Sequence, residues 1–170
     1  FLFTLIALSI IVFLSTYDDL KPIDPKIRLI FQLICVYFSI TSIPIYEINL
    51  PIKVSIFICL CTWVYIINIT NFSDGSDGFL STNTIFVYAN LIFIDNFLNL
   101  DLFSSKISFF ILPSIIIFLY FNKPNAKLYM GDSGSILIGF INGTISARLN
   151  IAPFIVTLGM MLIARGLAEG

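Results

Sequence analysis

Residues 51 to 78 read PIKVSIFICLCTWVYIINITNFSDGSDG. The first part, from Pro51 to Ile67, is almost wholly apolar, as expected for a helix that enters a membrane. The second part carries an amide or a carboxylate at every third position, at Asn68, Asn71, Asp74 and Asp77. The stretch therefore predicts a membrane helix that ends in a polar, acidic segment.

The whole chain has the composition of a membrane protein. Of its 170 residues 58% are hydrophobic, 11% are charged and 18 are Phe, and the mean hydropathy is +1.01. Soluble domains are only about 45 to 50% apolar. The apolar runs are Phe1 to Tyr17, Ile27 to Ile45, Pro51 to Ile67, Phe79 to Ile94, Ile107 to Phe121, Ser135 to Ala147 and Ala152 to Ala164. They predict an all-α fold, a polytopic transmembrane helix bundle of about seven spans, because barrel strands would alternate over about 10 residues.

The chain shows no linker or internal repeat, so residues 1–170 are predicted to form a single membrane-embedded domain. Its first residue is Phe1 rather than Met and lies inside an apolar run, which indicates a fragment truncated at both ends. The first run is expected to be a span and not a removed signal peptide. We therefore expect this bundle to be part of a larger one.

The acidic residues are predicted to share one side of the membrane. If the runs cross alternately, the segments after the first, third and fifth runs share a side, and these hold Asp18, Asp19, Asp74, Asp77 and Asp132. The same side holds six of the nine Lys and Arg residues, so the positive-inside tendency makes it cytoplasmic. A carboxylate near the bilayer centre costs about 2.5 to 3.5 kcal/mol, so clustered acids in such a chain need a reason.

The pair Asp18-Asp19 follows the first apolar run. Two carboxylates in one site repel each other, so they need a cation or one of them takes up a proton. Lys21, Lys26 and Arg28 follow closely and can supply part of that charge. The alternative is an ordinary loop that marks the membrane boundary.

The segment from Asn68 to Gly78 offers a more specific pattern. Side chains at every third position align on one face of a 3₁₀-like turn but drift around an α-helix. Gly75 and Gly78 disfavour a regular α-helix and let the backbone approach a ligand closely. The amides suit a base or a sugar, and the acids are hard oxygen ligands. The alternative is a polar turn rich in Asn and Asp.

The third motif is Gly131-Asp-Ser-Gly-Ser135, where a polar loop ends and an apolar helix begins. Asp132 or Ser133 can cap that helix, and free N–H groups at its start suit a phosphate held beside a metal-bound Asp132. Lys127 could add a positive charge to the same anion. Gly-Asp-Ser-Gly also occurs around serine-protease nucleophiles, but the chain contains no His, which excludes a Ser-His-Asp triad.

Acids, amides and lysines on one predicted face indicate a Mg²⁺ site that serves a phosphate-bearing substrate. Mg²⁺ is usually held by one or two carboxylates together with substrate phosphate oxygens. The chemistry predicted from the residues is phosphoryl transfer. Two alternatives remain at this point: a membrane transporter whose acids line an ion path, and an inactive scaffold for envelope assembly.

In their order, the three motifs resemble those of the polyprenyl-phosphate N-acetylhexosamine-1-phosphate transferases, or glycosyltransferase family four. The match comprises Asp18-Asp19 with a basic segment and Gln32, then Asn68 to Gly78, then Phe121-Asn122 to Ser135. The form Asn-Phe-Ser-Asp-Gly looks closer to the branch that initiates O-antigen and enterobacterial common antigen than to the muramoyl-pentapeptide branch. The family's His-containing motif would then lie beyond Gly170.

The resemblance implies transfer of a sugar 1-phosphate from a UDP-N-acetylhexosamine to undecaprenyl phosphate, with release of UMP. The reaction would initiate a cell-envelope polysaccharide such as lipopolysaccharide at the cytoplasmic face of the bacterial inner membrane. Mg²⁺ would be the cofactor, with Mn²⁺ as a substitute. We further expect a multi-pass protein in the lipid bilayer that forms a homodimer. No nucleic acid partner is expected.

The resemblance also implies roles for single residues. Asp132 would bind the metal, and Asp18 and Asp19 would be catalytic by orienting or deprotonating the lipid phosphate. The residues expected to bind the nucleotide-sugar or its metal are Asn68, Asn71, Asp74, Asp77, Asn122 and Lys127. For Asp77 a structural role is the alternative.

Overall fold

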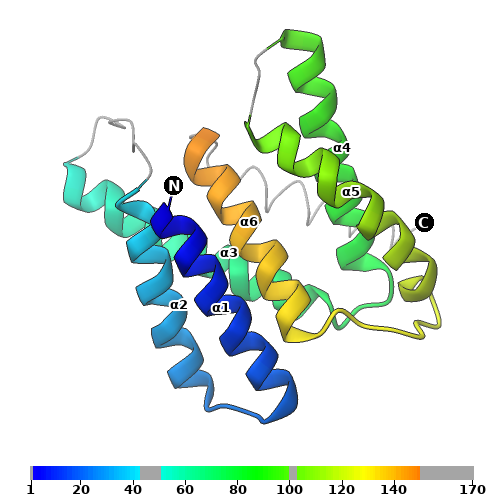
Figure 1. Ribbon diagram of the computed structural model, residues 1–170, viewed down its shortest axis with the longest axis horizontal. Helices are drawn as coiled ribbons and strands as arrows, with labels where there is room; N and C mark the ends of the chain where they lie inside the picture. Colours follow the sequence, from blue (N-terminus) through cyan, green and yellow to red (C-terminus); the bar gives the residue numbers. More distant parts are fainter. Residues whose placement is uncertain (1, 43–50, 100–102, 150–170) are drawn as a thin grey trace. The chain divides into compact units, whose positions relative to one another are not determined.

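The computed structural model describes residues 2–42, 51–99 and 103–149 (Figure 1). Within these ranges the regular structure is entirely helical, which confirms the predicted all-α class. The helices are α1 (Leu2–Leu20), α2 (Pro25–Ile40), α3 (Ile52–Ser73), α4 (Phe79–Leu98), α5 (Phe103–Asn122) and α6 (Gly131–Leu149).

The helices fall into two compact units. The first unit contains α1, α2, α3 as far as Phe72, and α6, whereas the second contains α4 and α5 with the loops between Ser73 and Tyr129. In the first unit α1 packs against both α2 and α6, and in the second α4 packs along α5 (Figure 1). The prediction that residues 1–170 form one domain stays a prediction.

Three helices are long and apolar enough to cross a membrane by length and composition: Leu2–Leu20, Ile52–Ser73 and Ser105–Asn122. The prediction of about seven spans is therefore not supported by the described helices. Helix α2 has 16 residues, fewer than the roughly 20 that a span needs. Helices α4 and α6 are long enough but carry polar residues such as Asn83 and Asn142. The seventh apolar run, Ala152 to Ala164, lies outside the described residues.

Two helices extend further than the apolar runs indicated. Asp18 and Asp19 lie in the last turn of α1 rather than in a loop. Helix α3 continues to Ser73, so Asn68 and Asn71 lie on a regular α-helix and not on a 3₁₀-like turn. The expectation from the glycines was wrong for these two residues because Gly75 comes after the helix has ended.

A short connection turns the chain from α1 into α2. The Asp24 carboxylate caps α2 by accepting a hydrogen bond from the Lys26 N–H at 2.8 Å. Pro25 occupies the first helical position, where its missing N–H costs nothing. Because of this cap, Arg28 lies in the first turn of α2, close to the end of α1.

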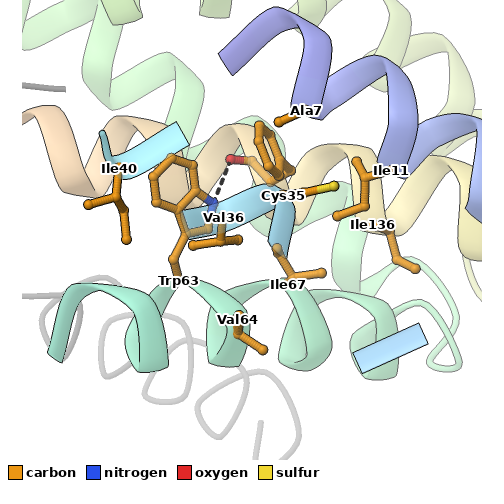
Figure 2. Close-up of a cluster of buried hydrophobic side chains, with 10 residues drawn as sticks. Ala7, Ile11, Cys35, Val36, Ile40, Trp63, Val64, Ile67 and Ile136 are labelled. Atoms are coloured by element: carbon orange, nitrogen blue, oxygen red, sulfur yellow. Dashed lines mark hydrogen bonds between the residues drawn. The ribbon is translucent and has the colours of Figure 1, made fainter. Parts of the chain in front are cut away.

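The core of the first unit lies where α1, α2, α3 and α6 meet (Figure 2). Trp63 of α3 is buried against Phe140 of α6, with ring centroids 5.3 Å apart. Its indole Nε1 donates to the Phe140 carbonyl at 3.2 Å, so the buried polar atom is satisfied. Ile11 of α1 and Val36 of α2 close the same cluster.

Two glycines allow α6 to pack closely on α3. A Cβ at Gly139 would lie 2.7 Å from the Ile67 Cα, and a Cβ at Gly143 would lie 2.0 Å from the Trp63 Cδ1. Small residues four positions apart are a common way for membrane helices to approach each other. This contact holds Asp132, at the start of α6, beside Asn71, near the end of α3.

Large apolar side chains point outward from both units. Phe13, Phe72 and Phe110 are 77%, 82% and 79% exposed. Apolar surface on this scale is unusual for a soluble monomer and suits helices surrounded by lipid tails. The described residues thus form an all-helical assembly of membrane type.

Candidate functional site

Arg28 joins two acidic residues in the first unit. Its Nη1 donates to Asp18 Oδ2 at 2.8 Å and also to Asp132 Oδ2. The side chains of Arg28, Asp18 and Asp132 are 25%, 7% and 27% exposed. The first turn of α2 therefore links the last turn of α1 to the first turn of α6 through one cationic nitrogen.

The second oxygen of Asp132 is held by Asn71. The Asn71 Nδ2 donates to Asp132 Oδ1 at 2.7 Å and to the Ser135 hydroxyl at 2.9 Å. The Ser135 hydroxyl in turn donates to the Gly131 carbonyl at 2.7 Å. These bonds fix the Asp132 carboxylate from its α3 side. We call Asp18, Arg28, Asn71 and Asp132 the Arg28 cluster.

The second oxygen of Asp18 is also held by the protein. Its Oδ1 accepts from the Ile23 N–H at 2.6 Å, in the turn between α1 and α2. Each acid of the cluster thus has one oxygen bound to a neutral N–H donor and its other oxygen bound to Arg28. The two Oδ2 atoms converge on a single positive charge.

Asp19 has a different role from Asp18. Its two carboxylate oxygens accept from the N–H groups of Asp132, at 2.8 Å, and of Ser133, at 3.0 Å. The start of α6 is therefore capped by an acid from α1. The sequence had suggested that Asp132 or Ser133 caps α6 and leaves these N–H groups free for a phosphate, which does not hold for these two groups.

Gly131 makes room for this cap. Its φ of +70° lies in the left-handed region that favours glycine. A Cβ at this position would come within 3.2 Å of both Asp19 carboxylate oxygens. The glycine of the Gly131-Asp-Ser-Gly motif thus allows α1 and α6 to approach each other.

Asn68 lies one turn before Asn71 on α3. Its Nδ2 donates to Gln32 Oε1 at 2.7 Å and to the Val64 carbonyl at 2.8 Å. Gln32, on α2, is buried. In this structure Asn68 joins α3 to α2, and its predicted contact with the substrate stays a prediction.

The second unit contains a separate polar arrangement around Asp77. Asp77 Oδ2 accepts from the N–H groups of Asn125 and Ala126 at 3.0 and 3.1 Å, and Oδ1 accepts from the Tyr129 hydroxyl at 2.6 Å. The Tyr129 hydrogen bond and the two backbone bonds hold the pKa of the Asp77 carboxyl below its usual range. The same bond raises the pKa of the Tyr129 hydroxyl. We call these four residues the Asp77 clamp.

Asn122, at the end of α5, holds the same two loops together. Its Oδ1 accepts from the Gly78 N–H at 3.1 Å and from the Ser81 hydroxyl at 2.8 Å, while Nδ2 donates to the Leu128 carbonyl at 2.9 Å. The side chain is fully buried. Asn122 and Asp77 both bind protein groups here, and their predicted contact with the nucleotide-sugar stays a prediction.

Two other predicted site residues lie in the same loops. Asp74, directly after α3, is buried. Lys127 is exposed, and its backbone N–H donates to the Phe121 carbonyl at 2.9 Å. The predicted site residues therefore fall into two groups: Asp18, Asp19, Asn68, Asn71 and Asp132 in the first unit, and Asp74, Asp77, Asn122 and Lys127 in the second.

The Arg28 cluster has a donor set that fits a hard divalent cation. Among the described residues there is no group of three or more His, Cys, Asp or Glu side chains that could hold a metal ion by themselves. Mg²⁺, however, rarely uses such a cage and takes one or two carboxylates plus phosphate oxygens. Asp18 Oδ2 and Asp132 Oδ2, which already meet at one cationic nitrogen, match that requirement.

Sequence reasoning missed two residues of this site. Arg28 was noted only as one of three nearby cations, and Ser135 only as the end of a motif. The cap Asp24-Pro25 was the available signal for Arg28, since it starts α2 and so places Arg28 in the first turn. The contact between Asn71 and Ser135 joins residues 64 positions apart and has no local signal.

The described helices are apolar and carry a cluster of acidic and polar residues at their ends. These features define the class of protein: a helical membrane protein with a polar site. Within that class, the chain belongs to glycosyl transferase family 4, whose family model matches residues 1–150. This confirms the family that the three motifs resembled.

Curated relatives give a narrower comparison. The chain is 30% identical over 145 residues to the phospho-N-acetylmuramoyl-pentapeptide-transferase of Leuconostoc citreum, covering 84% of this chain and 44% of that protein. It is 30% identical over 152 residues to the protein of the same name from Staphylococcus saprophyticus, covering 84% and 46%. A third, from Prochlorococcus marinus, is 37% identical over 106 residues, covering 60% and 29%. The chain thus spans less than half the length of these relatives, and their names give no support to the predicted O-antigen and enterobacterial common antigen branch.

Proposed function

We propose that the protein transfers a sugar 1-phosphate from a UDP-N-acetylhexosamine to undecaprenyl phosphate and releases UMP. Family membership supports this class of reaction. The observation that carries the proposal is the convergence of Asp18 Oδ2 and Asp132 Oδ2 on one cationic nitrogen. Two carboxylates that meet at one point could hold a divalent cation, which would supply the concentrated positive charge that phosphoryl transfer requires.

In the proposed reaction an oxygen of the lipid phosphate attacks the phosphorus that carries the sugar. A new bond forms between that oxygen and phosphorus, and the bond from this phosphorus to the bridging oxygen breaks. The bridging oxygen leaves with its electron pair as part of UMP. The products are a diphosphate-linked lipid sugar and UMP, so no oxidant or further reactant is required.

The proposed roles follow from the contacts. Asp132 and Asp18 would hold Mg²⁺ or Mn²⁺, which when bound neutralises phosphate charge. Asn71 keeps the Asp132 carboxylate oriented through Oδ1. Asp19, which caps α6, is proposed to position Asp132 rather than to act on the lipid phosphate. Asp74 is proposed to face the donor.

The position of the acids favours a transferase over the alternative of an ion path. Asp18 lies in the last turn of α1 and Asp132 in the first turn of α6. Acids that line an ion path are expected within spans, near the middle of the bilayer. The setting that we propose is the inner membrane of a bacterium, with the acidic site facing the cytoplasm.

The test is an assay of the full-length protein in detergent with undecaprenyl phosphate and a panel of UDP-sugars. The panel includes UDP-N-acetylglucosamine, UDP-N-acetylgalactosamine and UDP-N-acetylmuramoyl-pentapeptide, because the relatives named above belong to the muramoyl-pentapeptide branch. We expect UMP and a lipid-linked product in the presence of Mg²⁺ or Mn²⁺ and neither product with EDTA. Absence of product with every donor would refute the proposal, and product with EDTA would remove the metal from it.

A further inference from the structure

Arg28 holds a position that a divalent cation would need. Its Nη1 contacts Asp18 Oδ2 and Asp132 Oδ2, which come from α1 and α6. Their partner oxygens are bound to the Ile23 N–H and the Asn71 amide, so each acid has one oxygen left for a cation. In the structure both of these oxygens are bound to Arg28.

The electrostatics explain why a cation is required at this point. Two carboxylates that share a site disfavour each other's ionised form unless positive charge lies between them. The side chains of Asp18 and Asp132 are only 7% and 27% exposed, so water screens this repulsion in part. Arg28 supplies one positive charge. Its Nη1 holds the Oδ2 atoms of Asp18 and Asp132 around one point, as a shared metal ion would.

The same geometry makes Arg28 a competitor of the metal. A guanidinium nitrogen and a divalent cation cannot both lie between the same two oxygens. The Arg28 side chain is 25% exposed, so it has a path toward solvent. It comes from the first turn of α2, next to the connection with α1.

We propose that Arg28 is an exchangeable counter-ion, which holds Asp18 and Asp132 together until a divalent cation displaces it. The inference rests on the proposed function in one respect, that a divalent cation uses Asp132. It gives Arg28 a positioning role. The displaced guanidinium is then free to pair with a substrate phosphate, for which its planar fork is suited.

The experiment measures Mn²⁺ binding to the full-length protein in detergent by titration calorimetry or by electron paramagnetic resonance. Arg28→Gln is expected to bind Mn²⁺ more tightly than the parent, because the competitor is gone. If Arg28 occupies the site for about nine-tenths of the time, the apparent affinity rises about tenfold on its removal. Lys26→Gln is the matched control, since it removes a positive charge from the same turn of α2, and its affinity is expected to match the parent's.

Thermal unfolding gives a second readout. With EDTA, Arg28→Gln is expected to melt below the parent, since Asp18 and Asp132 then lack a shared cation. Saturating Mn²⁺ is expected to raise the melting temperature of Arg28→Gln by more than that of the parent, by mass action on a tighter site. If Arg28→Gln does not fold, Arg28→Lys keeps the charge on a shorter, single-point donor, and its Mn²⁺ affinity is also expected to exceed the parent's.

Adding Asp132→Asn to Arg28→Gln tests whether the gain arises at this site. The gain in Mn²⁺ affinity is expected to vanish in the double variant. Unchanged or weaker Mn²⁺ binding in the Arg28 variants would overturn the inference, as would a gain that persists without Asp132. This result is separate from the transferase assay: tighter Mn²⁺ binding without product from any UDP-sugar would refute the proposed function alone, and product with unchanged binding would refute the role of Arg28 alone.

Discussion

The Arg28 cluster and the Asp77 clamp hold carboxylates in two different ways. In the cluster, Asp18 and Asp132 share one cationic nitrogen, and each also accepts from a neutral donor. In the clamp, Asp77 accepts from two backbone N–H groups and a tyrosine hydroxyl. Charge is balanced by charge in the first case and by dipoles in the second.

This difference indicates that the Arg28 cluster is a functional site and that the Asp77 clamp supports the loop structure. Paired acids around one cation can exchange that cation for another, so their surroundings favour metal and phosphate chemistry. A single acid bound by neutral donors from one loop fixes the loop and offers nothing to exchange. Acidic residues that look alike in the sequence are therefore expected to respond differently to the same substitution.

The largest difference is expected in activity. Asp132→Asn is expected to lower kcat for the proposed transfer by roughly 100- to 1000-fold in the full-length protein, because the variant loses a ligand of the proposed metal ion, whose positive charge would stabilise the transferring phosphoryl group. Asp77→Asn makes the same chemical change in the clamp and is expected to stay within about tenfold of the parent. UMP release with saturating substrates and Mg²⁺ measures both. Equal losses in the two variants would erase the distinction.

The next effect concerns stability in the second unit. Asn122→Ala leaves the Gly78 N–H and the buried Ser81 hydroxyl without their acceptor. Unsatisfied buried groups cost about 1 to 3 kcal/mol, so the free energy of unfolding is expected to fall by that amount.

A control for this substitution lies in α4 of the same unit. Asn90 is exposed, and its Nδ2 donates to the Phe86 carbonyl one turn earlier. Asn90→Ala is expected to change the free energy of unfolding by less than about 0.5 kcal/mol. Unfolding in detergent, followed by circular dichroism, compares the two. A loss at Asn90 as large as that at Asn122 would show that the loop contacts carry no special stability.

The helices were largely predictable from the sequence, because the apolar runs mark them directly. The runs starting at Pro51 and Phe79 correspond to α3 and α4. The helix ends were harder to predict, since a polar residue in the last turn of a helix cannot be distinguished from a loop residue by the apolar pattern. Asp18 and Asn71 were both placed beyond a helix for this reason, yet each lies on one.

The candidate site was predictable in residue type but not in pairing. The five aspartates were found because charge is rare in this chain. Their partners depend on packing between distant segments: Asp19 bonds N–H groups 113 and 114 positions away. The choice of Arg28 over Lys21 or Lys26 depends on where α2 begins and on its distance from α6, which no local pattern encodes.

A smaller effect is expected from the cap on α6. Asp19→Ala removes the acceptor for the Asp132 and Ser133 N–H groups and is expected to cost about 0.5 to 2 kcal/mol of stability. Asp19→Asn keeps one of the two acceptor oxygens and is expected to retain part of that stability, since Asn also caps helices. Asp24→Ala, which removes the cap of α2, is the comparison within the same unit. The cap assignment fails if Asn destabilises as much as Ala when thermal unfolding of the three variants is compared.

The smallest effect is expected in the pH response of the Asp77 clamp. The pKa of Asp77 in the folded protein lies below its usual value of 3.8. The contribution of the clamp to the free energy of unfolding is therefore fully present above pH 3.8 and is lost as the pH falls through the lowered pKa. Because the folded pKa of Tyr129 lies above its usual 10.0, the contribution is complete below pH 10.0 and is lost as the pH rises through the raised value.

The amide signals of Asn125 and Ala126 in nuclear magnetic resonance spectra report this clamp directly, since both N–H groups bond Asp77 Oδ2. We expect their chemical shifts to be constant between pH 5 and pH 9 and to move below pH 3.8. Tyr129→Phe removes the bond that contributes most to the lowered pKa of Asp77, so the acid transition is expected to shift toward higher pH. An acid transition at the same pH in Tyr129→Phe would mean that the two backbone N–H groups hold the carboxylate without the tyrosine.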